Sequence, residues 1–172
     1  MKSCCVTGHR NIPYEKIKYV IKELRREILL AIKDGHTHFI SGFADGADLI
    51  FSDIVTEMKA EHPNITLEAA IPYRKRLHTK SNTFQRLIEL CDKVTVVSEN
   101  YVKGCYNLRN IYMLKNADRV IGVYDGRESG GTAFTIRNAF VAGKEVRIIR
   151  VNEWTPFVTL SGARVCGFPR KL

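Results

Sequence analysis

Strand-like runs alternate with helical periods along most of the chain, and this alternation limits the possible folds more than any other feature. Between the runs, apolar residues recur at helical spacing, as in Ile17, Ile21, Leu24 and Ile28. Strands that alternate with helices are joined by right-handed crossovers and pair in parallel, with helices covering both faces. The sequence therefore predicts an α/β fold, a three-layer α/β/α sandwich around a Rossmann-like, mainly parallel sheet. The predicted strands are Cys4 to Thr7, Thr37 to Ser41, Thr66 to Ile71, Lys93 to Val97, Arg119 to Val123 and Glu145 to Val151.

The predicted helices have recognisable ends as well as apolar faces. Pro13 occupies the first turn of the first helix, and Gly35 follows its last residue. The alternation stops at Asn152, so residues 1–151 are predicted to form one Rossmann-like domain. Residues 152–172 are predicted to be a C-terminal arm or an edge strand of the same domain. The later helices are predicted around Ala47 to Met58, Thr83 to Cys91, Tyr106 to Lys115 and Thr132 to Ala142.

Composition argues against several classes of protein. A chain of 172 residues suits one domain with a full core. Its five cysteines have neither CxxC spacing nor the density of a disulfide scaffold, which favours reduced thiols in the cytoplasm. No apolar run approaches the length of a membrane span and no signal peptide is recognised, so we expect no membrane partner. The histidines lack ligand spacing, so we predict no metal site.

Two further observations narrow the choice of ligand. The formal net charge of +9 gives only weak support for nucleic acid, because the basic cluster Arg74-Lys75-Arg76 lacks interleaved aromatic residues. Nucleic acid is therefore not the favoured partner. The chain contains no GxxxxGK[ST] or GxGxxG segment, which disfavours a Walker-type ATPase and an ordinary NAD dehydrogenase.

Glycines and polar residues follow the predicted strands. The first strand leads into Thr7-Gly8-His9-Arg10, and the second into the segment SGFADGADL, Ser41 to Leu49. The fifth leads into Tyr124-Asp125-Gly126 and then Gly130-Gly131-Thr132. In open α/β sheets, ligands bind outside the carboxyl ends of the strands. The sequence therefore predicts a binding site at this edge of the sheet.

The segment Gly130-Gly131-Thr132 has the composition of an anion site. Glycines leave backbone N–H groups accessible, and the first turn of a helix directs such groups and its dipole toward negative charge. Thr132 can donate its hydroxyl to a phosphate oxygen or cap the helix. A tight loop with a capping threonine is the alternative interpretation, and the glycines at the same edge favour phosphate binding.

Several side chains at this edge are candidates for contacts with the rest of a ligand. Asp48 can accept hydrogen bonds from a ribose or a base, and Arg10, next to His9, can pair with a phosphate. Arg109 and Asn110 can reach the edge from the fourth helix. Helix capping, a hydrogen bond that fixes a loop, and a solvent-exposed helix face are the structural alternatives for these residues.

Four motifs together resemble the YpsA-like branch of the SLOG superfamily, which groups DprA-type DNA-processing proteins with LOG-type nucleotide hydrolases. The resemblance covers roughly Lys2 to Val151, and the motifs occur in the expected order. They read CCVTGHRNIP, SGFADGADL, YNLRNIYML and VYDGRESGGTAFTIRNA.

This resemblance implies a Rossmann-like domain that binds a nucleotide or a nucleotide-derived ligand, such as an ADP-ribose or NAD-related compound. Members of the branch resemble sensors or binders more than enzymes, and many SLOG proteins form homodimers. We expect little or no catalysis and no bound cofactor. The implied nucleotide- and phosphate-binding residues are Gly8, His9, Arg10, Gly42, Gly46, Asp48, Arg109, Asn110, Gly130, Gly131 and Thr132.

The chain departs from LOG enzymes at one position. Those enzymes carry a glutamate shortly after the glycine-threonine pair, and it serves in cleaving the N-glycosidic bond. Here the segment from Ala133 to Ile136 contains no carboxylate. An N-glycosidic hydrolase of nucleoside monophosphates is thus an alternative that needs Asp48 or Asp125 as its catalytic carboxylate. DprA-like binding of single-stranded DNA is the other alternative.

Overall fold

The computed structural model describes residues 1–152 and 164–166, and these residues form a seven-stranded sheet in the order β4-β3-β2-β1-β5-β6-β7. Every neighbouring pair of strands is parallel. The predicted α/β sandwich with a parallel sheet is therefore confirmed. The strands are β1 Lys2–Gly8, β2 His36–Ser41, β3 Thr66–Ile71, β4 Lys93–Val96, β5 Arg119–Tyr124, β6 Glu145–Arg150 and β7 Arg164–Cys166.

The helices differ from the prediction only near their ends, apart from one short 3₁₀ helix. Pro13 directly precedes α1 instead of lying within its first turn, and α5 begins at Gly131. The 3₁₀ helix η1 is not anticipated by the sequence pattern. The helices are α1 Tyr14–Lys33, α2 Ala47–Met58, η1 Arg74–His78, α3 Asn82–Glu89, α4 Cys105–Lys115 and α5 Gly131–Val141.

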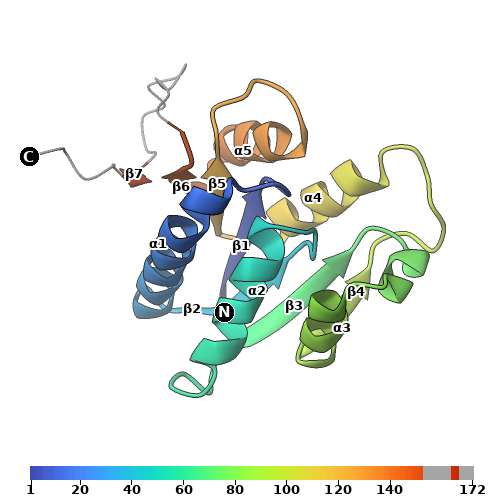
Figure 1. Cartoon of the computed structure of the whole chain (residues 1–172), viewed down its shortest axis with the longest axis horizontal. Helices are drawn as coiled ribbons and strands as arrows, with labels where there is room; N and C mark the ends of the chain where they lie inside the picture. The colour runs from blue at the N-terminus through green and yellow to red at the C-terminus, as the bar shows by residue number, and fades with distance from the viewer. Residues whose placement is uncertain (153–163, 167–172) are drawn as a thin grey trace, which may run out of the picture.

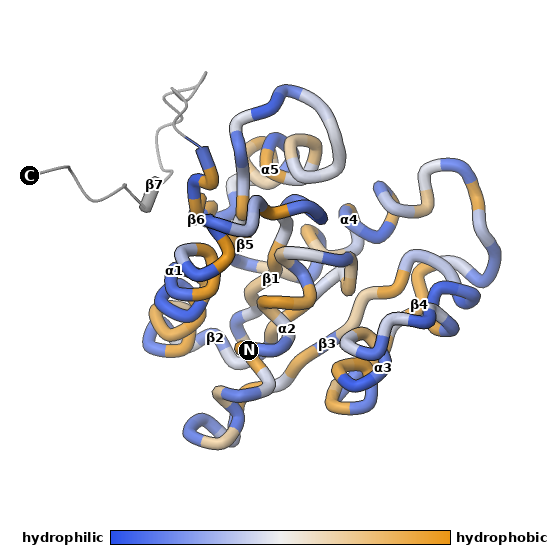
Figure 2. The backbone as a smooth tube through the Cα atoms, in the orientation of Figure 1, coloured by the Kyte–Doolittle hydropathy of each residue, from blue (hydrophilic) through white to orange (hydrophobic). Residues whose placement is uncertain are grey.

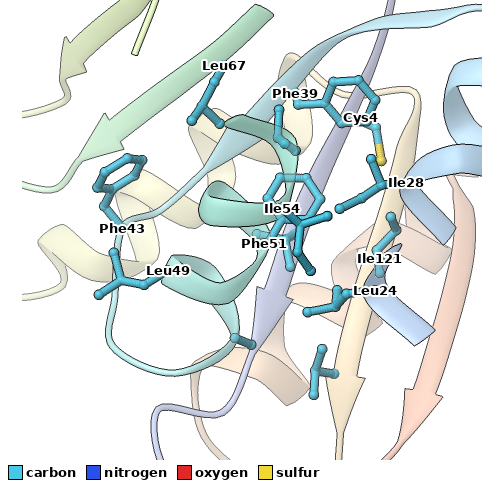
Figure 3. Packing of buried hydrophobic residues seen from close by; sticks show 14 of the residues in the cluster. Cys4, Leu24, Ile28, Phe39, Phe43, Leu49, Phe51, Ile54, Leu67 and Ile121 are labelled. Carbon is cyan, nitrogen blue, oxygen red and sulfur yellow. The ribbon is translucent and has the colours of Figure 1, made fainter. Parts of the chain in front are cut away.

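Two hydrophobic clusters cover the two faces of the sheet. Successive residues of β1 point to opposite faces, so Cys4 and Val6 join one cluster and Cys5 joins the other. The first cluster contains side chains of α1, α2 and α3, and Figure 3 shows Ile28 beside Cys4 and Leu24 beside Ile121 within it. Side chains of α4 and α5 belong to the second cluster. The helices thus lie on both sides of the strands (Figure 1), and hydrophobic positions alternate with hydrophilic ones along α1 (Figure 2).

The order in which the strands are added to the sheet changes direction at β1, which lies in the middle of the sheet. Strands β2, β3 and β4 lie successively on one side of β1, whereas β5, β6 and β7 lie on the other. Connections that leave β1 and β5 therefore diverge to opposite faces of the sheet. A crevice at the carboxyl ends of such strands is where doubly wound folds place their ligands.

The C-terminal segment is described only over Arg164–Cys166. These residues form β7, which pairs in parallel with β6 in the register Ile148↔Val165. The rest of the predicted arm, residues 153–163 and 167–172, lies outside the described residues. Its assignment to the same domain stays a prediction.

A buried carboxylate ties three strands to α4. Glu68 of β3 is 1% exposed. His38 lies 2.7 Å from its Oε2, while the hydroxyls of Tyr112 and Thr95 donate to Oε1 at 2.6 and 2.7 Å. Lys93 donates to Oε2 at 3.2 Å. Burial by itself raises the pKa of Glu68, but these four partners outweigh it and lower the pKa to about 2.

We predict that Glu68→Gln lowers the free energy of unfolding at pH 7 by about 1–3 kcal/mol, because it removes the charged acceptor of this network. The pKa of Glu68 is depressed in the folded state, so the carboxylate stabilises the fold above its unfolded pKa of about 4.3. That stabilisation is lost as the pH falls toward about 2. Urea unfolding between about pH 3 and 7 measures both effects. The exposed Glu61→Gln is the matched control, and equal acid sensitivity of the wild type and Glu68→Gln would contradict the prediction.

Candidate functional site

A pocket of about 480 Å³ opens at the carboxyl edge of the sheet, beside the ends of the paired strands β1 and β5, where the connections that follow them diverge. Its wall is formed by the end of β1 and the loop after it, by the first half of α4, and by the loop and first turn that start α5. The predicted site residues that line the pocket are Gly8, His9, Arg10, Asp48, Arg109, Asn110, Gly130, Gly131 and Thr132. Gly42, Gly46 and Asp125 lie outside this lining.

Backbone N–H groups at the start of α5 have no acceptor within the described part of the chain. Gly130 precedes the helix with a φ of 99°, and no side chain of residues 1–152 caps the helix. Among the residues that the structure describes, no acceptor pairs with the N–H groups of Gly131, Thr132 or Ala133. Thr132 lies within the first turn, so the expectation that it could cap the helix is wrong. The accessible amides are the arrangement that an anion requires.

Arg109 is part of the pocket lining, and its guanidinium fills a space beside Gly42 that is open only because residue 42 has no side chain. Its Nη1 donates to the carbonyl oxygen of Gly42, and a Cβ atom on Gly42 would overlap the guanidinium. The same Nη1 lies 3.5 Å from Oδ2 of Asp48. The Arg109 side chain is 7% exposed, and its Nε has no hydrogen-bond partner among the described residues. The protein therefore pairs this buried guanidinium only in part.

Asp48 is buried, and the Arg109 guanidinium 3.5 Å away compensates its negative charge only in part. Burial raises the pKa of Asp48 to about 6, against the opposing effects of Arg109 and of the Ala44 amide, which donates to Oδ2 at 3.2 Å. The carboxylate is therefore mostly ionised at neutral pH and gains a proton in mildly acidic solution. It can accept hydrogen bonds from ligand hydroxyls or donate one when protonated.

Gly8 and Gly46 serve close packing behind the site. A Cβ atom on Gly8 would overlap that of Ala47, and one on Gly46 would overlap the backbone carbonyls of His9 and Arg10. Gly46 also has a φ of 78°, which favours glycine. The Ala47 amide donates to the carbonyl of His9 at 3.2 Å. These contacts fix the loop after β1 against the start of α2.

Asp125 anchors neighbouring side chains instead of facing the pocket. Arg127 donates to its Oδ2 through Nε at 2.9 Å and through Nη2 at 2.5 Å. Nε2 of His9 lies 2.8 Å from Oδ1 of Asp125 and 3.1 Å from the backbone nitrogen of the same residue. The His9 ring also stacks on Tyr124 with 5.8 Å between centroids. Burial lowers the pKa of His9 despite the nearby carboxylate, so the imidazole is neutral at pH 7.

Sequence reasoning missed Arg127 and Tyr106, which both line the pocket. The guanidinium carbon of Arg10 lies 5.2 Å from the centroid of the Tyr106 ring. Tyr73 packs edge-to-face on Tyr106, with 6.2 Å between centroids and an angle of 87°. The available signal for Tyr106 was its helical spacing, three residues before Arg109 and four before Asn110.

These features define a Rossmann-like α/β protein with a polar pocket at the switch point of its sheet. A family model described as the YspA SLOG family (YpsA) matches residues 4–151, and the chain belongs to this family. It is 27% identical over 142 residues to a UPF0398 protein of Ligilactobacillus salivarius, covering 75% of this chain and 78% of the relative. The predicted YpsA-like membership is confirmed.

Solved structures of other proteins share the fold. DNA processing protein A from Helicobacter pylori, described with a single-stranded DNA binding mode, matches with a TM-score of 0.61 and 18% identity. The match covers 86% of this chain and 64% of that protein, so the neighbour is substantially longer. The molybdenum cofactor carrier protein from Chlamydomonas reinhardtii matches with a TM-score of 0.56 and 16% identity, covering 89% of this chain and 79% of the carrier. Identities this low establish the fold alone.

We predict that Gly42→Ala lowers the free energy of unfolding by about 1–3 kcal/mol, because the added methyl group displaces the Arg109 guanidinium from its buried seat. In an Arg109→Ala background the same substitution should cost less than half as much, since the overlapping group is gone. Urea unfolding of the four proteins of this double-mutant cycle measures the difference. Equal costs in the two backgrounds would show that Gly42 is not needed to seat Arg109.

Proposed function

We propose that the pocket binds a nucleotide or a nucleotide-derived ligand whose phosphate lies at the first turn of α5, with little or no catalysis. The observation that supports this most directly is the set of N–H groups at Gly131 and Thr132 that have no acceptor among the described residues. A phosphate oxygen would satisfy these donors and would also interact favourably with the helix dipole.

The charges around the pocket favour an anion. Arg10, Arg109 and Arg127 line it, whereas Asp48 is the acidic residue in its lining. Asp125 offsets Arg127, and Asp48 partly offsets Arg109. Arg10 pairs with no carboxylate among the residues described, so its guanidinium is available for a phosphate.

The pocket also suits the uncharged parts of a nucleotide. Its volume of about 480 Å³ lies within the range of small-molecule sites. Asp48 can accept hydrogen bonds from ribose hydroxyls, and the Asn110 amide lies close to the start of α5. An ADP-ribose or NAD-related compound is part of the proposal, as are the homodimer that the resemblance implies and the cytoplasmic location that the cysteine usage favours. Among the described residues, no helix is both long and apolar enough to cross a membrane.

Asp48 supports a second function, the hydrolysis of the N-glycosidic bond of a nucleoside monophosphate. A buried carboxyl group with a pKa of about 6 can act as a general acid near neutral pH. In this reaction the bond between C1′ and the base nitrogen breaks and Asp48 protonates the leaving nitrogen. Water then adds its oxygen to C1′ and gives up a proton, which restores the protonated Asp48. The products are the free base and ribose 5-phosphate.

Binding of single-stranded DNA is less well supported. The likeness to DNA processing protein A concerns the fold, and the net charge of +9 is the further observation in its favour. Such binding should weaken steeply with salt, by about 0.7 logarithmic units per phosphate contact for each tenfold rise in salt.

We predict that Gly131→Asp weakens nucleotide binding at least about tenfold while the protein stays folded. The new carboxylate would occupy the position proposed for the phosphate, but at a first-turn position it interacts favourably with the helix dipole. Isothermal titration with AMP, ADP, ADP-ribose and NAD measures the effect. Asn82→Asp introduces the same charge at the first residue of α3 and should bind like the wild type. Absence of binding across the whole panel for the wild type would overturn the proposed function.

The second function makes a separate prediction about base release. Wild-type protein incubated with nucleoside monophosphates should release base fastest below about pH 6, where Asp48 holds a proton. Asp48→Asn should abolish the release, and the exposed Asp45→Asn should preserve it. Chromatography of free base and ribose 5-phosphate measures the rate. If Asp48→Asn retains the wild-type rate, or if no base forms at any pH, this function is excluded.

A further inference from the structure

Three tyrosines from separate parts of the chain meet beside the pocket. Tyr73 follows β3, Tyr101 follows β4, and Tyr106 lies in the first turn of α4. The Tyr73 ring stands at 87° to both of the others, with centroid distances of 5.4 Å to Tyr101 and 6.2 Å to Tyr106. We call Tyr73, Tyr101 and Tyr106 the tyrosine cluster.

The tyrosine cluster is separate from the hydrophobic core. None of its members belongs to either of the two core clusters, and Tyr101 is 66% exposed. Tyr106 lines the pocket, and the flat guanidinium of Arg10 lies over its ring at 5.2 Å from the centroid. A planar cationic group on an aromatic ring marks a face that other planar groups can occupy by stacking.

One face of α4 connects this ring to the proposed phosphate position. Tyr106, Arg109 and Asn110 are spaced by three and four residues, so their side chains project from the same face of the helix. All three line the pocket. Nδ2 of Asn110 lies 3.5 Å from where a Cβ atom on Gly131 would stand. Four residues of helix advance about 6 Å, which is the scale of a ribose between a base and a phosphate.

From this arrangement we propose that Tyr106 is the stacking surface for the planar base of the ligand, and that it makes the pocket selective for base-bearing nucleotides over base-free sugar phosphates. This inference rests on the proposed function, since it places the phosphate at α5. When the ligand binds, the base takes the place of the Arg10 guanidinium on Tyr106, and Arg10 turns to the phosphate. Tyr73 holds the Tyr106 ring by its edge-to-face contact.

Stacking area sets the expected order of ligands. A purine covers more of the Tyr106 ring than a pyrimidine does, and a base-free sugar phosphate covers none of it. The wild-type protein should therefore bind AMP more tightly than CMP, and CMP more tightly than ribose 5-phosphate. Stacking of one base on an aromatic side chain typically changes affinity by about tenfold, so this is the expected difference between AMP and ribose 5-phosphate.

The experiment is isothermal titration of AMP, ADP-ribose, CMP and ribose 5-phosphate into the wild type and three variants. Tyr106→Leu should weaken AMP and ADP-ribose about tenfold and leave ribose 5-phosphate unchanged. Tyr106→Phe keeps the ring and should bind like the wild type. Tyr14→Leu is the matched control, because Tyr14 is 88% exposed and is not among the residues that line the pocket.

The outcomes separate this inference from the proposed function. Equal affinity of the wild type for AMP and ribose 5-phosphate, with no effect of Tyr106→Leu, would overturn the stacking role and leave phosphate binding intact. Absence of binding for all four probes would overturn both. If Tyr106→Leu does not fold, the ligand series on the wild type and on Tyr106→Phe still decides, because a base-independent affinity contradicts the proposal.

Discussion

The site depends on three chain segments approaching one another more closely than side chains would allow. Because Gly8 has no side chain, the start of α2 can contact the end of β1. Gly46 likewise lets the start of α2 contact the backbone of the loop that follows β1. Gly42 leaves room for the Arg109 guanidinium. Each approach is incompatible with a Cβ atom, and the backbone of α2 is additionally fixed by the bond from Ala47 to His9. Because these contacts set the positions of the loop after β1 and of α4, they set the shape of the pocket between them. The glycines therefore act through packing, and the ligand would contact the groups that they position.

This packing buries the Arg109 guanidinium, so that water cannot fully solvate its charge. The charges of the pocket depend on how the protein compensates this buried cation. Burying Arg109 requires partners, which the Gly42 carbonyl and Asp48 supply. Nε of Arg109 is buried and lacks a hydrogen-bond partner among the described residues, so the guanidinium is only partly compensated. Asp48 shares the burial, and its pKa of about 6 shows that its charge is only partly compensated. The net charge facing a ligand therefore rises as Asp48 gains a proton in mildly acidic solution.

The sequence predicted the parts of this structure that depend on the periodicity of apolar residues and on the residues that follow each strand. The strand-helix alternation indicated the sandwich, and the residues after the strands indicated which edge would carry the pocket, including Asp48 and Arg109. Contacts between distant segments were not predictable in this way. Nothing in the local pattern around Gly42 indicates that it faces Arg109, 67 residues later. Phe43, in the loop between β2 and α2, has a φ of 53°, unusual for phenylalanine, and its ring packs edge-to-face on Phe84 of α3.

The arrangement of carboxylates favours holding a ligand over cleaving it. The first turn of α5 and the residues after it carry no acid, so no carboxylate stands next to the proposed phosphate position on that side. Asp125 is bound by Arg127 and contacts His9, and releasing it would cost those hydrogen bonds. Asp48 faces the pocket, but its Arg109 partner favours the ionised form, which opposes the proton that a general acid must carry. At neutral pH, catalysis would therefore depend on the minor, protonated form of Asp48, whereas the proposed binding would use Arg109 and the α5 amides as they stand.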